Sequence, residues 1–295
     1  MMTAEKNKIR FVAFLTAVFL LLSPLTAKAK TKAKKAAASD SGYPKSIVAL
    51  SPSAAEILYA VGAGDQVSAV SEFTDFPEEA KAKPVVGGFD GKTLSIETIM
   101  SFKPDLVYLT DGMHNFLIET LESNGIAYYL SKGDSIASVE KEILDIGKIT
   151  GHEKEAEKVV DGMEKKLKKA ADANAKKGTA VKVYWEVWNA PYMSAGAASF
   201  INDVIKAAGG ENIFADLPEA YPMVSEEAII SRQPAVILIP ASTGLAASAV
   251  GQRNGWADIP AVKDAKVFVV DDNVYTRPGS RVADVVLDLA GLLDK

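Results

Sequence analysis

Two glutamates, Glu97 and Glu227, occupy the same position in a segment that occurs twice in the sequence. Residues 94–109 and 224–239 align at an offset of 130, with a serine two residues before each glutamate and a proline seven residues after it. Serine suits a helix N-cap, and a glutamate in the first turn is favoured by the helix dipole. The two carboxylates therefore either serve their own helices or offer a matched acidic pair to a partner.

A second set of residues could bind a ligand. Aromatic and polar side chains gather on loops expected at the carboxyl ends of strands, where open α/β sheets bind their ligands. Aromatic rings stack on a flat ligand, and a phenol or guanidinium binds amides or carboxylates at its edge. For any single ring, packing in the core is the alternative. The candidates are Phe73, Phe76, Phe89, Asp90, Trp188, Tyr192, Tyr221, Asn273, Tyr275 and Arg277.

The sequence does not carry the common catalytic motifs. It has no G-x-S-x-G, no H-E-x-x-H and no Walker loop, and residues 87–92 lack the spacing of a phosphate loop. Its two histidines, His114 and His152, stand apart and do not form the His and carboxylate cluster of a zinc or manganese site. His114 follows a strand, so a surface turn, a place beside the ligand or axial ligation of a bound metal remain open. We expect no enzyme, no catalytic residue, no resident metal and no cofactor.

The elements that must position these residues follow a repeated plan. In each copy a short helix is ended by proline and followed by an apolar run that suits a strand buried on both faces. A looser repeat ends helices at Gly62 and Gly209. Strands alternating with helices predict an α/β lobe in each half. The expected strands are 46–50, 67–70, 106–109, 126–130, 181–187, 236–239 and 267–270.

A different pattern separates the two halves. From Glu153 onward, opposite charges three and four residues apart favour a helix of about 25 residues, which would span about 37 Å. A coiled-coil arm is the alternative, but apolar positions are too sparse for several heptads. The predicted organisation is an N-terminal α/β lobe at 44–134, a helical linker at 135–178 and a C-terminal α/β lobe at 179–295.

The first residues indicate export. Residues 1–29 combine a basic start, the apolar run 11–22 and Ala27-Lys28-Ala29, the pattern of a cleavable secretory signal peptide, and a basic leader follows at 30–43. A retained anchor is the alternative, although about 12 apolar residues fall short of the roughly 20 of a spanning helix. The chain has no cysteine, so neither a disulfide nor a lipidated cysteine is expected. We predict a periplasmic or other extracytoplasmic location.

Charge limits the partners. The net charge is −5, and removing residues 1–29 takes away four positive charges and one negative charge, which leaves −8. An acidic body argues against nucleic acid as a partner.

Five motifs, in order, resemble those of the periplasmic solute-binding proteins of ABC importers for cobalamin, iron-siderophores and haem. They stand at residues 46–58, 85–89, 96–107, 208–214 and 274–281. The resemblance covers about residues 44–293 and implies a class III fold, in which two Rossmann-like α/β lobes are joined by one long helix. It also implies a ligand between the lobes, little closing motion, and Glu97 and Glu227 paired with arginines of the two permease subunits.

The resemblance further suggests the ligand. Phe76, Phe89, Tyr192 and Tyr221 fall on aromatic pocket positions of cobalamin-binding members, and residues 185–196 resemble a block of those proteins. The chain departs from them where tryptophans are replaced at Phe89, Tyr221 and Thr110, which predicts a roomier site. We expect a corrinoid of the cobalamin type, with cobinamide, haem or a ferric siderophore as alternatives. The expected partners are this small molecule and a permease dimer, and the protein is expected to be a monomer.

Overall fold

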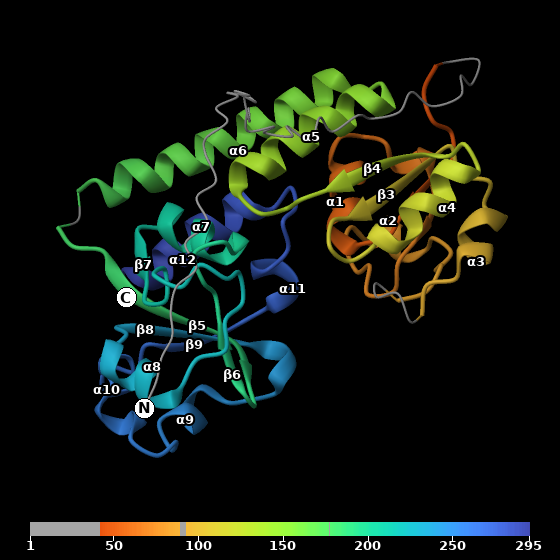
Figure 1. The fold of residues 1–295 in the computed structure, drawn as a ribbon. Helices are drawn as coiled ribbons and strands as arrows, with labels where there is room; N and C mark the ends of the chain where they lie inside the picture. The colour runs from red at the N-terminus through yellow and green to blue at the C-terminus, as the bar shows by residue number, and fades with distance from the viewer. Residues whose placement is uncertain (1–41, 89–92, 177) are drawn as a thin grey trace, which may run out of the picture. The chain divides into compact units, whose positions relative to one another are not determined.

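Four short apolar runs form the first sheet of the protein (Figure 1). The computed structural model describes residues 42–88, 93–176 and 178–295, so the predicted signal peptide and nearly all of the leader lie outside the described residues. All neighbouring strands are parallel, in the order β2-β1-β3-β4. The strands are β1 (Ile47–Ala49), β2 (Val67–Val70), β3 (Leu106–Thr110) and β4 (Ala127–Ser131).

The second sheet repeats this arrangement. Strand β5 pairs in parallel with β7 and β8, and β8 pairs in parallel with β9. The order β7-β5-β8-β9 thus matches β2-β1-β3-β4, and β6 is an addition that runs antiparallel to the end of β5. The strands are β5 (Val181–Asn189), β6 (Tyr192–Ser194), β7 (Gly210–Asn212), β8 (Val236–Pro240) and β9 (Val267–Val270). All seven predicted strands are confirmed, with small shifts at their ends.

The repeated segments form the same unit in both halves. Helices α3 (Ile96–Ser101) and α8 (Glu226–Arg232) are each capped by the predicted serine, whose hydroxyl accepts a backbone N–H at 3.2 and 3.1 Å. Each helix is followed by the strand that lies third in its sheet, β3 or β8. The prediction of a duplicated helix–proline–strand unit is therefore confirmed.

The looser repeat also holds. Helices α1 (Pro52–Ala60) and α7 (Phe200–Ala207) end beside Gly62 and Gly209, whose φ angles of 89° and 85° are in the left-handed region that favours glycine. The remaining short helices are α2 (Glu78–Lys81), α4 (Ile118–Ser123), α9 (Ala247–Val250), α10 (Pro260–Lys263) and α11 (Asp272–Tyr275). Single 3₁₀ turns stand at Gly64–Gln66, Asn115–Leu117, Ala241–Thr243 and Trp256–Asp258.

The connection between the halves consists of two helices. Helix α6 (Glu153–Asn174) has 22 residues, about 33 Å at 1.5 Å per residue, and forms the predicted long helix. It is preceded by α5 (Ile136–Thr150), and Gly151, with φ of 83°, separates the two. Helix α6 packs against α5, contacts α1 of the N-terminal half, and packs against α7 and α12 (Val282–Leu293) of the C-terminal half. It therefore joins both halves through side-chain packing.

Successive side chains of the strands point to opposite faces of each sheet and enter different hydrophobic clusters. Ile47 of β1 and Val183 of β5 point into one shared cluster, which also contains residues of α5, α6 and α12. Their neighbours Val48 and Tyr184 point the other way, into separate clusters of the N-terminal and C-terminal halves. One face of each sheet thus contributes to a core that both halves share. Among the described residues, no helix has the length and apolar character needed to cross a membrane.

Candidate functional site

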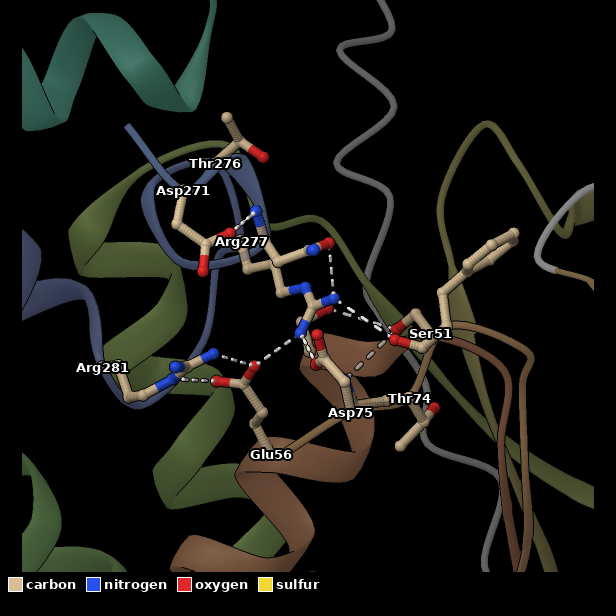
Figure 2. Close-up of polar contacts among 12 residues, drawn as sticks. Ser51, Glu56, Thr74, Asp75, Asp271, Thr276, Arg277 and Arg281 are labelled. Atoms are coloured by element: carbon tan, nitrogen blue, oxygen red, sulfur yellow. Dashed lines mark hydrogen bonds and ion pairs between the residues drawn. The ribbon is translucent and has the colours of Figure 1, made fainter. Parts of the chain in front are cut away.

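Two arginines of the C-terminal half meet a buried glutamate of the N-terminal half (Figure 2). Glu56 lies on α1, and its side chain is only 1% exposed. Arg281 donates to its two carboxylate oxygens from Nε at 3.0 Å and from Nη2 at 2.7 Å. Arg277 adds a longer bond from Nη1 at 3.3 Å. We call these three residues the Glu56 cluster; it links the two halves by charge-assisted hydrogen bonds.

Arg277 has three further acceptors in the protein. Its Nη1 also binds the carboxylate of Asp75, and its Nη2 donates to the carbonyl of Phe73 at 3.2 Å and to Oδ1 of Asn273 at 2.9 Å. Each terminal nitrogen of a guanidinium carries two N–H groups, so these four bonds use both nitrogens fully. The guanidinium that the sequence assigned to the ligand is therefore engaged by acceptors of the chain itself.

The loop after β2 exposes two aromatic rings. Phe73 is 64% exposed and has a left-handed φ of 66°, and Phe76 is 41% exposed. The guanidinium carbon of Arg281 lies 4.2 Å from the centroid of the Phe76 ring, within cation–π distance. Arg277 thus holds this loop through Asp75 and the Phe73 carbonyl, Arg281 contacts it through the Phe76 ring, and both rings keep an exposed surface.

The aromatic candidates of the C-terminal half surround the β5–β6 hairpin. Trp188, near the end of β5, is 51% exposed, and its indole donates to the Ala190 carbonyl at 3.0 Å. Tyr192 begins β6 and is partly buried. Tyr221 is 46% exposed, in a segment held against β6 by a bridge between Met193 and Met223. The structure therefore brings these three predicted rings to one hairpin and its neighbour.

Tyr275 and Asn273 differ from the other candidates. Tyr275 is 7% exposed, its ring centroid lies 6.0 Å from that of Trp185, and its hydroxyl donates to Asp288. Its ring belongs to the shared core and offers no open surface to a ligand, in contrast to the expectation. Asn273 uses its side-chain oxygen to accept from Arg277. Two further candidates, Phe89 and Asp90, lie outside the described residues.

Exposed apolar residues that the sequence reasoning missed also follow the strands. Met113 (38% exposed) and Phe116 (51%) come directly after the carboxyl end of β3. Met223 is 72% exposed beside β6. A signal was available for Met113 and Phe116, which follow a predicted strand and the Gly112 turn. Met223 stands before a predicted helix, where no such pattern marks it.

The structure places His114 in the interior. Its side chain is fully buried, and Nδ1 accepts the backbone N–H of Thr110 at 2.9 Å. In the described ranges of the chain, no group of three or more His, Asp or Glu side chains is arranged to hold a metal ion. His114 thus serves the turn after β3 in this conformation.

The repeated glutamates lie at the start of equivalent helices. Glu97 and Glu227 are both exposed. A backbone N–H of the helix's first turn and the hydroxyl of Ser95, which donates at 2.8 Å, lower the pKa of Glu97 below its usual value. Its carboxylate is therefore ionised at neutral pH and open to a cationic partner.

Comparison with known proteins agrees with this fold. The chain belongs to the periplasmic binding protein family, whose sequence model matches residues 47–274. It is 34% identical over 257 residues to the uncharacterized ABC transporter substrate-binding lipoprotein YvrC of Bacillus subtilis, which covers 84% of this chain and 79% of that protein. It is 27% identical over 245 residues to the vitamin B12-binding protein of Vibrio parahaemolyticus, covering 82% and 87% of the two chains.

A solved structure supports the same assignment. The fold is similar to that of the periplasmic vitamin B12 binding protein BtuF of Vibrio cholerae, with a TM-score of 0.75 and 26% identity over 85% of this chain and 97% of that one. The protein has the class III fold of two α/β lobes joined through a long helix, and it is a substrate-binding protein of the ABC-transporter class. Its family is one of solute-binding proteins.

Proposed function

We propose that this protein binds a corrinoid of the cobalamin type and delivers it to the permease of an ABC importer. The observation that carries the proposal is the state of the two arginines beside the exposed rings. Arg277 and Arg281 are both paired with carboxylates of the chain, Glu56 and Asp75. The rings of Phe73 and Phe76, in the loop that these arginines contact, keep exposed surface for a ligand.

This surface suits a large ligand with a mostly neutral edge. A corrin ring is broad and carries amide side chains, whereas haem carries two carboxylates and many ferric siderophores are anionic. An anionic ligand would have to take a guanidinium from a buried carboxylate, and leaving such a carboxylate unpaired is costly. Exposed rings such as Phe73, Phe76 and Trp188 can instead stack on a macrocycle, and each would lose water-exposed apolar area.

The relatives support the same ligand class. The vitamin B12-binding protein of Vibrio parahaemolyticus and BtuF of Vibrio cholerae match this chain over more than four fifths of its length. We propose that the ligand lies among the aromatic candidates at the carboxyl ends of the strands. Haem and ferric siderophores are the competing ligands, and a secreted enzyme is the more distant alternative.

The docking residues complete the proposal. Glu97 and Glu227 are exposed, start equivalent helices and follow a duplicated plan, which suits a permease made of two equivalent subunits. We propose that each pairs with basic side chains of one subunit, which would orient the docked protein. We also propose export through the segment 1–29, action outside the cytoplasm as a monomer, and no catalytic step.

Isothermal titration calorimetry tests the ligand. The purified protein is titrated with cyanocobalamin, haem and a ferric hydroxamate siderophore at equal concentrations. The expected result is one cyanocobalamin per chain and at least tenfold weaker binding of the other two. Binding of haem or the siderophore without binding of cyanocobalamin would end the corrinoid assignment and leave the transporter class standing.

A further inference from the structure

A partly buried polar network in the C-terminal half connects Tyr192 to the first turn of α8. Glu226 is the first residue of that helix, and one oxygen of its carboxylate, Oε1, accepts two hydrogen bonds. The Trp256 indole donates at 2.7 Å, and the Tyr192 hydroxyl donates at 3.3 Å. Tyr192, a candidate ligand residue, is thus bonded to the residue that directly precedes Glu227 in α8.

The other residues of the network fix the position of the Trp256 indole. Arg253 binds Glu186 through both of its terminal nitrogens, at 2.5 and 2.9 Å, and the Glu186 side chain is fully buried. The guanidinium carbon lies 4.6 Å from the Trp256 ring centroid and 5.4 Å from that of Tyr192. Trp256 is itself fully buried. The indole is therefore fixed, and the long Tyr192–Glu226 bond is the weakest link.

The Glu226 carboxylate is not needed to cap the helix. The hydroxyl of Ser225 already accepts the backbone N–H of Ala228 at 3.1 Å. In the equivalent helix α3, the hydroxyl of Ser95 caps in the same way, and the position that matches Glu226 is Ile96, which packs against the N-terminal apolar cluster. The repeated helix therefore forms without a carboxylate at its first position, so the carboxylate of Glu226 has a role specific to α8.

The protonation state of Tyr192 makes its hydroxyl the donor in the hydrogen bond to Glu226. Burial raises the pKa of the Tyr192 hydroxyl, a rise that Arg253 opposes and Glu226 adds to. The phenol is therefore protonated at neutral pH and acts as the donor to Glu226. A ligand group that accepts a hydrogen bond from this hydroxyl would replace the Glu226 carboxylate as its acceptor.

We propose that Glu226 is a positioning residue that couples ligand contact at Tyr192 to the first turn of α8, and so to Glu227. The coupling rests on the proposed function, because it needs a ligand at Tyr192 and a partner at Glu227. When a ligand amide accepts the hydrogen bond of the Tyr192 hydroxyl, Glu226 keeps only the hydrogen bond from the Trp256 indole. Its carboxylate then turns toward Trp256. The backbone of the first turn shifts with it. The signal is confined to the C-terminal half, since α3 has Ile96 at this position.

Nuclear magnetic resonance of ¹⁵N-labelled protein tests the coupling without requiring a ligand. The chain has three tryptophans, so the indole N–H of Trp256 gives one of three signals, assigned with the Trp188→Phe variant and by triple-resonance spectra. In the ligand-free protein, Tyr192→Phe keeps the ring and removes the hydroxyl. The expected result is a shift of the Trp256 indole signal and of the Glu227 backbone amide, with no shift at the Glu97 amide.

Tyr128→Phe is the matched control. Its hydroxyl donates to Glu122 at 3.2 Å, a bond of the same kind in the other half. This variant should leave the Trp256 and Glu227 signals in place. If Tyr192→Phe moves these two signals no more than Tyr128→Phe does, the coupling is refuted.

A second arm adds saturating cyanocobalamin to the unaltered protein and to Tyr192→Phe. The ligand-induced shift at Trp256 and Glu227 should be several-fold smaller in Tyr192→Phe, although direct ring-current effects of the ligand act on both proteins. Equal shifts in the two proteins would contradict the coupling. Absence of cyanocobalamin binding in calorimetry would instead count against the proposed ligand, and the ligand-free arm would still decide on the coupling.

Discussion

The two copies of the repeated unit, residues 94–109 and 224–239, share a backbone plan and differ in what their side chains contact. Both have a serine cap, an exposed glutamate and a buried strand. In the N-terminal copy, Ile96 packs on an apolar cluster, whereas Glu226 in the C-terminal copy joins Tyr192 and Trp256. The exposed glutamate is thus present in both copies, whereas the residue before it differs with the contacts that each half offers.

The central strands show a second difference. Tyr108 of β3 donates to the buried carboxyl of Glu142 on α5, which also accepts from Ser131 at 2.7 Å. The position that matches Tyr108 in β8 is Leu238, which lies in the same shared core without a polar partner to satisfy. The N-terminal half therefore attaches to α5 partly through a buried acid, whereas at the matching position of the C-terminal half the contact is apolar.

The largest expected effect comes from removing what the two copies share. Glu97→Ala combined with Glu227→Ala should abolish stimulation of the importer's ATPase and leave cyanocobalamin affinity unchanged, because both residues are exposed and neither is one of the ligand candidates. ATPase assays of the reconstituted importer and calorimetry check the two readouts. The control is Glu119→Ala with Glu211→Ala, which changes the net charge equally at two other exposed sites. A loss of ligand affinity would mean that the docking assignment is wrong.

The next largest effect is expected on stability, when the polar link between the halves is removed. Glu56→Gln should lower the free energy of unfolding by about 3–5 kcal/mol, because two guanidinium groups lose a buried carboxylate. Urea denaturation followed by circular dichroism measures it, with the exposed Glu119→Gln as control. A change below about 1 kcal/mol would show that the Glu56 cluster contributes little to stability.

The buried acid of α5, Glu142, predicts a pH dependence. Burial raises the pKa of Glu142 from 4.5 to about 7, against hydrogen bonds from Tyr108 and Ser131 that lower it. Between these values the folded protein binds more protons than the unfolded chain, so stability should fall as pH rises from about 4.5 to about 7. The contribution of this group is at most about 3 kcal/mol.

Glu142→Gln isolates that contribution. The variant keeps a polar side chain at the site and removes the titrating group, so its unfolding free energy should vary less between pH 4.5 and pH 7 than that of the unaltered protein. Urea denaturation at several pH values provides the comparison. An identical pH profile in both proteins would contradict the assignment of the slope to Glu142.

The smallest expected effects compare the aromatic residues of the two halves. Phe76→Ala and Trp188→Ala should each weaken cyanocobalamin binding by about 1–3 kcal/mol, the usual value for burying one ring. Leu144→Ala, which removes an exposed apolar side chain from α5, should leave binding unchanged. Calorimetry measures all three variants. If only one ring matters, the ligand contacts only one half.

Much of the fold could be predicted because it depends on local patterns. The strands at 67–70 and 267–270 have the predicted limits, since each is an apolar run between turn residues. The long helix begins at Glu153 as expected. The separate helix α5 was not distinguished from it within the linker, because the break depends on one left-handed glycine, Gly151.

The candidate site was harder to predict, because it depends on contacts between distant residues. Arg277 was assigned to the ligand, yet its partner Glu56 lies 221 positions away and no local pattern reveals it. Tyr275 lies on a four-residue helix, too short for sequence periodicity to tell which side faces the core. Glu226 received no role from the sequence, and only the positions of Tyr192 and Trp256 reveal its contacts.

The central claim is that aromatic surface binds the ligand while the arginines stay paired inside the protein. A crystal structure of the complex with cyanocobalamin tests this claim most directly. The expected result is a corrin ring in contact with Phe76 and Trp188, with Arg277 and Arg281 still bound to Glu56 as in Figure 2. A structure in which either arginine leaves Glu56 to bind the ligand, or in which the corrin lies away from these rings, would contradict it.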